Sequence, residues 1–254
     1  LLGVGSGAVA YNESQAVTIL GEPLTLVQST MALSPPTLRF QRDGRLHAAW
    51  IEKNGVQGEV KTAAISADHS AVAQVSVNPP GAGPEAVHQS PGFAIGVDGE
   101  QFVTWSSANK TPGALFASDL RLARLDSGGA RVQPPVQVND DGLAISHTFE
   151  HVIAGKNGEI YLAWLDGRNK DRSGAGIMFA CSRDHGATVD KNLVLDGMAC
   201  PCCRPMLAQA SDGSLWAAWR KTFEGNVRDI VIAHSTDQGR TFSPPTVVSR
   251  DGWV

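Results

Sequence analysis

One pattern of apolar and polar positions occurs four times along the chain. In each copy an acidic or amide residue and a glycine precede a short alternating stretch that ends in tryptophan, at Trp50, Trp105, Trp164 and Trp219. The four stretches are "DGRLHAAW", "DGEQFVTW", "NGEIYLAW" and "DGSLWAAW". Alternation with a period of two is typical of a β-strand with one buried face, and Asp-Gly or Asn-Gly favours a tight hairpin turn. The pattern therefore predicts β-hairpins throughout the chain and no long helix.

The spacing of these stretches predicts how the strands are grouped. The tryptophans lie 55, 59 and 55 residues apart, and the residues fourteen positions before them are Pro36, Pro91, Glu150 and Pro205. A period of this length, filled with short strands and turns, is typical of a β-propeller, whose blades are four-stranded antiparallel sheets. We therefore expect an all-β propeller with about four blades in this chain.

The repeats also define the expected domain organisation. Residues 35–254 should form the propeller, incomplete at its C-terminus, with repeats at about 35–82, 83–140, 141–198 and 199–250. We interpret residues 1–34 as the remnant of an export signal plus part of a blade strand. The triplet Ala8-Val9-Ala10 follows an apolar, glycine-rich stretch, as a signal-peptide cleavage site does. This segment favours a secreted or periplasmic protein.

Two turns late in the chain share a motif. "SRDHGATV" (182–189) and "STDQGRTF" (235–242) resemble the Asp box, Ser-x-Asp-x-Gly-x-Thr-aromatic, of the sialidase-like β-propellers with BNR repeats. The second turn matches at every defined position, whereas the first ends in Val189 instead of an aromatic residue. The resemblance implies a sialidase-like propeller of six blades, in which these boxes lie on the outer rim. It implies a structural role for Ser182, Asp184, Gly186, Ser235, Asp237 and Gly239.

The charge balance narrows the classes of partner. The chain has 21 Lys and Arg against 25 Asp and Glu, a net charge of −4, and it contains no basic run. A nucleic-acid partner is not expected, because phosphate backbones are bound by clustered Lys and Arg. No stretch approaches the roughly 20 apolar residues of a membrane-spanning helix, so no transmembrane segment is expected.

The loops that enter the first strand of each blade are the expected place for chemistry, because such loops meet around the axis of a propeller. They are "EAVHQSP" (85–91), "ISHTFEH" (145–151) and "ACPCCRP" (199–205). Their polar and sulfur-bearing side chains are His88, His147, Glu150, His151, Cys200, Cys202, Cys203 and Arg204. We expect these residues to face a glycan or another small molecule in the central channel, with a protein as the alternative partner.

The cysteines are open to three interpretations. Thiolates beside imidazoles suit zinc or copper, which would make Cys200, Cys202, Cys203, His88 and His147 the metal ligands. With Cys181 the chain has four cysteines, and an even number in an exported protein fits two disulfides equally well. Redox chemistry is the third interpretation.

A longer segment resembles the part of sialidases that runs from a strand, through a Gly-Arg loop with the acid/base aspartate, into an Asp box. It is "LAWLDGRNKDRSGAGIMFACSRDHG" (162–186). The resemblance implies Asp171 as general acid/base, with Arg168 nearby and Arg204 entering the channel from the next blade. Bidentate arginine suits a sugar carboxylate, and we add Glu150 to these substrate-binding residues. The structural alternative is that Arg168 and Asp171 decorate a solvated hairpin.

Two functions therefore compete. The first is an exported, glycan-handling protein of the sialidase superfamily, acting as an exo-α-sialidase-type glycoside hydrolase. The nucleophilic tyrosine of that family has no identified counterpart, because the chain contains only Tyr11 and Tyr161, and Tyr161 lies on a second strand. The alternative is a non-enzymatic propeller that binds copper, zinc or a protein through its cysteine cluster.

Overall fold

The computed structural model describes residues 25, 27–55, 57–65, 72–84, 89–169 and 175–248. Within these ranges the regular structure is β-strand, apart from two short 3-10 helices, η1 (Gly167–Asn169) and η2 (Glu224–Asn226). Neither helix in this part of the chain has the length or the apolar character needed to cross a lipid bilayer. The prediction of an all-β fold is confirmed.

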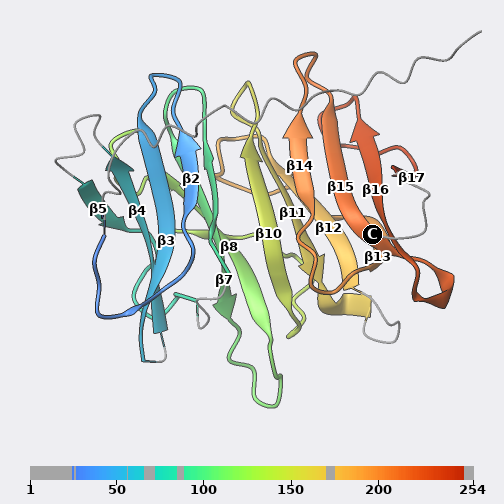
Figure 1. Ribbon diagram of the computed structural model, residues 1–254, viewed down its shortest axis with the longest axis horizontal. Helices are drawn as coiled ribbons and strands as arrows, with labels where there is room; N and C mark the ends of the chain where they lie inside the picture. Colours follow the sequence, from blue (N-terminus) through green and yellow to red (C-terminus); the bar gives the residue numbers. More distant parts are fainter. Residues whose placement is uncertain are drawn as a thin grey trace, which may run out of the picture.

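The strands form four antiparallel units that follow one another along the chain, from blue to red in Figure 1. The first unit contains β1 (Ala32–Leu33), β2 (Thr37–Phe40), β3 (Leu46–Asn54), β4 (Gln57–Ile65) and β5 (Val72–Ser76). The second contains β6 (Gly92–Ile95), β7 (Gln101–Ala108), β8 (Ser118–Leu125) and β9 (Val136–Gln137). The third contains β10 (His147–Ala154), β11 (Ile160–Asp166), β12 (Ala175–Ser182) and β13 (Leu193–Ala199). The fourth contains β14 (Met206–Gln209), β15 (Leu215–Thr222), β16 (Arg228–Ser235) and β17 (Thr246–Val247).

The first strands of the units lie next to one another. β2 contacts β6, β6 contacts β10, and β10 contacts β14. Each unit then continues outward in chain order, as in β6-β7-β8-β9, and the third and fourth units are joined by one residue pair, Ala199 with Lys221. Loops that enter the first strands are therefore brought together, which is the arrangement on which the predicted site depends.

Three of the four repeated tryptophans, Trp105, Trp164 and Trp219, pack between units, whereas Trp50 packs on residues of β3 and β4 in its own unit. All four lie on second strands and are buried, with exposed fractions of 4, 1, 0 and 2% for Trp50, Trp105, Trp164 and Trp219. Trp164 packs in one cluster with Phe102 and Leu120 of the second unit and Met178 of its own. The expectation of equivalent, buried tryptophans on second strands is confirmed.

The two Asp boxes form closed turns after the third strands of the last two units. Oδ1 of Asp184 accepts hydrogen bonds from the Thr188 N–H at 2.9 Å and from the Ser182 hydroxyl at 2.8 Å. The second box repeats these contacts with Asp237, Thr241 and Ser235. Gly239 has a φ of +80°, and a Cβ there would meet the ring of Phe179 at 2.6 Å, so only glycine fits. This geometry supports the structural role that the motif implies.

Replacing Ser182 with alanine should lower the melting temperature. The side chain is buried, and its Oγ accepts the N–H of Gly186 at 2.8 Å, so alanine leaves a buried N–H without an acceptor. Such a loss costs about 1–3 kcal/mol, and each kcal/mol lowers the melting temperature of a domain of this size by roughly 2–4 °C. Circular dichroism measures the shift, with the exposed Ser211→Ala as control. Equal melting temperatures for the two variants would contradict the structural role of the box.

Candidate functional site

A cavity of about 520 Å³ lies where the inner strands meet the loop before β14. Residues from all three segments predicted to meet, 85–91, 145–151 and 199–205, line it. The wall combines hydroxyl groups with aromatic rings: Ser90, Ser106, Ser118, Ser146, Thr148, Trp105, Phe116 and Phe149. Glu150 contributes a carboxyl group from the third unit, and Pro201 belongs to "ACPCCRP". The cavity therefore offers both polar and apolar surfaces to a ligand.

A β-bulge places Glu150 in this wall. The pairing of β10 with β11 shifts register between Thr148 and His151, and Phe149 has a left-handed φ of +57°. A bulge re-aims the side chains around it, and left-handed backbone at a phenylalanine is strained. Gly92 is required beside the bulge, because a Cβ there would lie 2.1 Å from Oγ1 of Thr104, whereas Cγ of Glu150 would be in ordinary contact at 3.5 Å. Strained backbone beside a cavity is a mark of functional sites.

The carboxyl group of Glu150 is held in an unusual electrostatic environment. Glu150 is 2% exposed, and this burial raises the pKa of its carboxyl group. The charge of Arg204 and the hydrogen bond from the Gly92 N–H act in the opposite direction and lower that pKa. The carboxyl therefore keeps its proton to a higher pH than an ordinary glutamate does. Arg204 reaches across from the fourth unit, where its Nη2 donates to the carbonyl oxygen of Ser90 at 3.1 Å. The structure thus brings together Glu150 and Arg204, as expected from the sequence.

Two further basic residues lie near this pair. His151 accepts the N–H of Leu207 on β14 at 3.1 Å through Nδ1, so it links the third and fourth units. Burial, together with the charges of Arg39 and Arg204, lowers the pKa of His151 to about 4, and the ring is neutral at neutral pH. Arg39 comes from β2 of the first unit and was not predicted from the sequence. No motif marks it, because it is one polar position in an ordinary alternating strand.

Arg168 belongs to a buried ion-pair network. Its Nε and Nη2 donate to the two carboxylate oxygens of Asp166 at 2.8 and 2.9 Å, and Nη2 lies 3.4 Å from Asp141. Nε2 of His147 lies 3.2 Å from Asp141 and 3.5 Å from Asp166. This arrangement differs from the expectation that Arg168 offers its guanidinium to a ligand, because two of its nitrogens already hold Asp166. One signal in the sequence could have indicated Asp166. Asp166 lies two residues after Trp164, and Glu52 lies two residues after Trp50 in the same way.

His147 braces one wall of the cavity. Its backbone N–H donates to Oγ of Ser118 at 2.9 Å, and its carbonyl oxygen accepts the hydroxyl groups of Ser106 and Ser118 at 2.7 and 3.0 Å. Its ring forms a group with Asp141 and Asp166, and the cysteines 200, 202 and 203 form a separate group among the described residues. The structure therefore does not bring His147 into the cysteine cluster.

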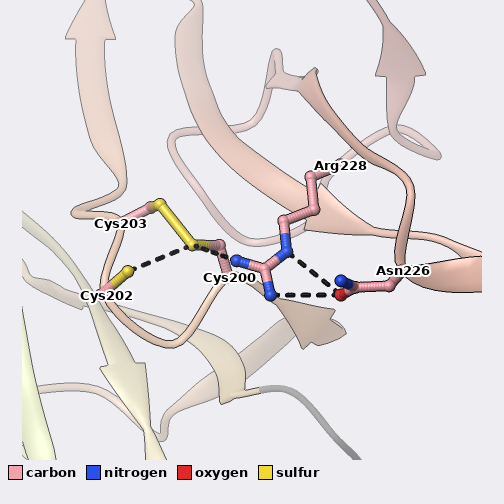
Figure 2. Close-up of a disulfide and its surroundings, with 5 residues drawn as sticks. All are labelled: Cys200, Cys202, Cys203, Asn226 and Arg228. Atoms are coloured by element: carbon pink, nitrogen blue, oxygen red, sulfur yellow. Dashed lines mark hydrogen bonds between the residues drawn. A yellow bond between two sulfur atoms is a disulfide. The ribbon is translucent and has the colours of Figure 1, made fainter. Parts of the chain in front are cut away.

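The cysteine cluster contains one disulfide. Cys200 is bonded to Cys203, with Cα atoms 5.5 Å apart, whereas Cys202 is a free, exposed thiol (Figure 2). In this form Cys200 and Cys203 have no thiolate to offer a metal, so the predicted three-cysteine site requires reduction. Cys181 is a free, buried thiol of β12, and burial raises its pKa to about 12. The interpretation as two disulfides is therefore wrong, because Cys181 lies in the core packing of the third unit.

Two of the residues predicted from the sequence, His88 and Asp171, lie outside the described residues. The described ends of the segment 170–174 both lie close to the cavity wall. On one side, the N–H of Gly167 donates to the carbonyl oxygen of Ser146 at 2.9 Å. On the other side, Ala175 pairs with Ala199, which is two residues from Pro201. Ser146 and Pro201 both line the cavity.

No protein-family model matches the chain, and no curated protein matches it. Solved structures match it at the level of the fold. A protein of unknown function from Dyadobacter fermentans DSM 18053 has a TM-score of 0.61 and 15% identity, over 87% of this chain and 70% of that one. The NanB sialidase of Streptococcus pneumoniae has a TM-score of 0.58 and 9% identity, over 89% of this chain and 54% of that one.

An α-L-arabinanase from Penicillium chrysogenum is similar to the same extent, with a TM-score of 0.54 and 17% identity, over 85% of this chain and 67% of that one. At such identities the likeness shows the fold alone. The chain spans about half the length of the NanB sialidase. The protein therefore has a sialidase-like β-propeller fold, as its Asp boxes predicted.

Proposed function

We propose that this protein is an exported glycan-handling propeller that acts as a glycoside hydrolase of the exo-α-sialidase type. The observation that carries the proposal is a cavity lined by hydroxyl groups, aromatic rings and Glu150, which is buried on a strained bulge and close enough to Arg204 for that charge to act on its carboxyl group. Hydroxyl groups can hydrogen-bond the hydroxyls of a sugar, and aromatic rings can cover its apolar face. The disulfide of Cys200 and Cys203 is compatible with export, because such bonds persist in oxidising compartments.

The residues of the cavity have distinct roles in this proposal. Arg204 binds the carboxylate of an acidic sugar, and the charge of Arg39 adds to the positive potential. Glu150, which keeps its proton more readily than an ordinary glutamate, donates a hydrogen bond to the ligand. Asp171 supplies the general acid/base group. Arg168 supports the start of the loop that carries Asp171, through its ion pairs with Asp166 and Asp141.

A metal-binding propeller is the second candidate function. The observation that favours it is that the sulfur atoms of Cys200, Cys202 and Cys203 lie within 4.8 Å of one another. Soft thiolates select Cu(I) or Zn(II), and the disulfide would have to be reduced first. Calorimetric titration of the reduced protein with each ion, against Cys202→Ser, tests this candidate. Equal affinities of the two proteins would reject it.

Glu150→Gln is the variant that tests the glycan proposal. It preserves the shape of the side chain, but its amide cannot ionise and is a weaker hydrogen-bond donor than a carboxylic acid. A hydrogen bond that involves a charged group contributes about 1.5–3 kcal/mol, so kcat/KM for a fluorogenic sialoside should fall by roughly 10- to 100-fold. The melting temperature should not fall at neutral pH. Because the folded state raises the pKa of Glu150, ionisation of this group costs stability as the pH rises, and glutamine has no such cost.

The matched control is Glu224→Gln, because Glu224 is exposed on η2 and remote in sequence from the cavity segments. It should leave both turnover and melting temperature unchanged. If the wild-type protein does not cleave the sialoside, calorimetry with N-acetylneuraminic acid separates a binding protein from an enzyme. If the folded protein shows no turnover and no binding, the glycan proposal is rejected.

A further inference from the structure

The segment 200–203 holds three sulfur atoms in one cluster. Cys200 and Cys203 form the disulfide, and Cys202 keeps its exposed thiol. Sγ of Cys202 lies 3.5 Å from Sγ of Cys200, in contact with the disulfide (Figure 2). Thiol–disulfide exchange proceeds by attack of a thiolate on one sulfur of a disulfide. The free thiol is therefore close to a disulfide sulfur. Because all three sulfur atoms lie within 4.8 Å of one another, Cys202 lies beside the Cys200–Cys203 bond, and the turn must move it into line with that bond before it attacks.

Cys200 is the anchored member of the cluster. Its side chain is buried, and its N–H donates to the carbonyl oxygen of Arg220 on β15 at 2.8 Å. Cys202 and Cys203 follow on a turn, in which the Cys203 N–H donates to the carbonyl oxygen of Cys200 at 3.3 Å. One anchored sulfur thus faces two alternative partners from the same turn.

An arginine faces the anchored sulfur. Nη1 of Arg228 lies 3.7 Å from Sγ of Cys200, and Nε and Nη2 donate to Oδ1 of Asn226 at 3.3 and 3.1 Å, which orients the guanidinium (Figure 2). During exchange one negative charge is spread over the three sulfur atoms. A positive charge at this position stabilises it, as basic neighbours do at other reactive cysteines.

We propose that residues 200–203 are a thiol–disulfide exchange site in which Cys202 is the nucleophile. The Cys202 thiol gives its proton to solvent, and its sulfur forms a bond with Sγ of Cys200. The bond between Cys200 and Cys203 breaks, and Cys203 leaves as a thiolate that takes up a proton. One disulfide and one thiol are present before and after the step, so no oxidant or reductant is required.

The exchange would change the wall of the cavity. Pro201 lines the cavity, and Arg204, which follows Cys203, donates to the carbonyl oxygen of Ser90 in the second unit. When Cys202 replaces Cys203 as the partner of Cys200, the loop closed by the disulfide becomes one residue shorter. Cys203, which directly precedes Arg204, is then no longer held by the disulfide. The disulfide isomer would therefore set the position of Arg204 relative to Ser90, which lines the cavity.

Disulfide mapping of the native, oxidised protein tests the proposal. Samples incubated with a low concentration of iodoacetamide are quenched with acid, digested and analysed by mass spectrometry. We expect two isomers, Cys200–Cys203 with alkylated Cys202 and Cys200–Cys202 with alkylated Cys203. Cys181 serves as the internal reference, because it is buried and should stay unlabelled until the protein unfolds.

Four variants sharpen the test. In a glutathione buffer, Cys203→Ser should form the Cys200–Cys202 bond, and Cys202→Ser should keep Cys200–Cys203 as its single isomer. Arg228→Met should slow the accumulation of alkylated Cys203 by about tenfold, the effect of losing one charge-assisted contact, whereas Arg228→Lys should slow it less. A folded Cys203→Ser protein in which Cys200 and Cys202 both remain free thiols would overturn the proposal. If that variant does not fold, a single isomer in the wild-type protein after prolonged incubation overturns it. Neither measurement uses a glycan, so the proposed hydrolase function is tested separately.

Discussion

Replacing Asp171 with alanine should lower the turnover of a fluorogenic sialoside by about 10²–10⁴-fold, the usual contribution of a general acid/base group. The sequence resemblance places Asp171 in the Gly-Arg loop before the first Asp box. The described residues at both ends of that loop lie beside the cavity wall, where Gly167 bonds to Ser146 and Ala175 pairs with Ala199. In the proposed function, Asp171 acts on the ligand that Glu150 and Arg204 are proposed to bind.

Steady-state kinetics distinguish this role from a contribution to binding. Loss of an acid/base group should lower kcat and kcat/KM together. Loss of a contact that binds the substrate and the transition state equally well should raise KM and leave kcat unchanged. Asp212→Ala is the control. Asp212 lies in an exposed hairpin turn, where Oδ1 of its side chain accepts hydrogen bonds from the N–H and the hydroxyl group of Ser214. Full turnover by Asp171→Ala would exclude Asp171 as the general acid/base group. Glu150 would then be the carboxyl group to test for proton transfer.

Replacing Trp164 with alanine should destabilise the protein by about 3–5 kcal/mol, the range for removal of a large buried aromatic side chain. Trp164 is fully buried between the second and third units. Its Nε1 also donates to Oδ2 of Asp166 at 3.2 Å, so the substitution removes one partner from the network of Arg168 and His147. The melting temperature should fall by roughly 2–4 °C for each kcal/mol lost.

Two other variants separate packing from the hydrogen bond. Trp216→Ala should change the stability little, because Trp216 is 39% exposed, stacks on His234 with ring centroids 5.0 Å apart, and donates through Nε1 to Oγ of Ser214 in the exposed hairpin turn. Trp164→Phe keeps most of the buried ring and loses the N–H, so it should cost less than alanine. Similar melting temperatures for Trp164→Ala and Trp216→Ala would contradict the assignment of Trp164 to the packing between units.

The candidate site was only partly predictable from the sequence. The register of the repeats indicated that residues 85–91, 145–151 and 199–205 meet, since it depends on chain spacing alone, and all three segments line the cavity. The contacts of individual side chains were not predictable in this way. Arg168 was expected to face a ligand, but it pairs with Asp166 and with Asp141, which precedes it by 27 positions in the chain. Such a pairing depends on how two loops approach each other in space.

By itself, the sequence determined the strands, their grouping into repeated units, the buried tryptophans and the closed Asp-box turns. These features are local, because alternation, hairpin glycines and the Ser, Asp and Thr of a box act within a few residues. Only the tertiary structure decided that Glu150 is buried beside Arg204 and that Cys200 pairs with Cys203 while Cys181 stays apart. The burial of Glu150 depends on the approach of strands from different units, which spacing along the chain does not specify. The pairing of Cys200 with Cys203 depends on the geometry of their turn, which brings the two sulfur atoms together.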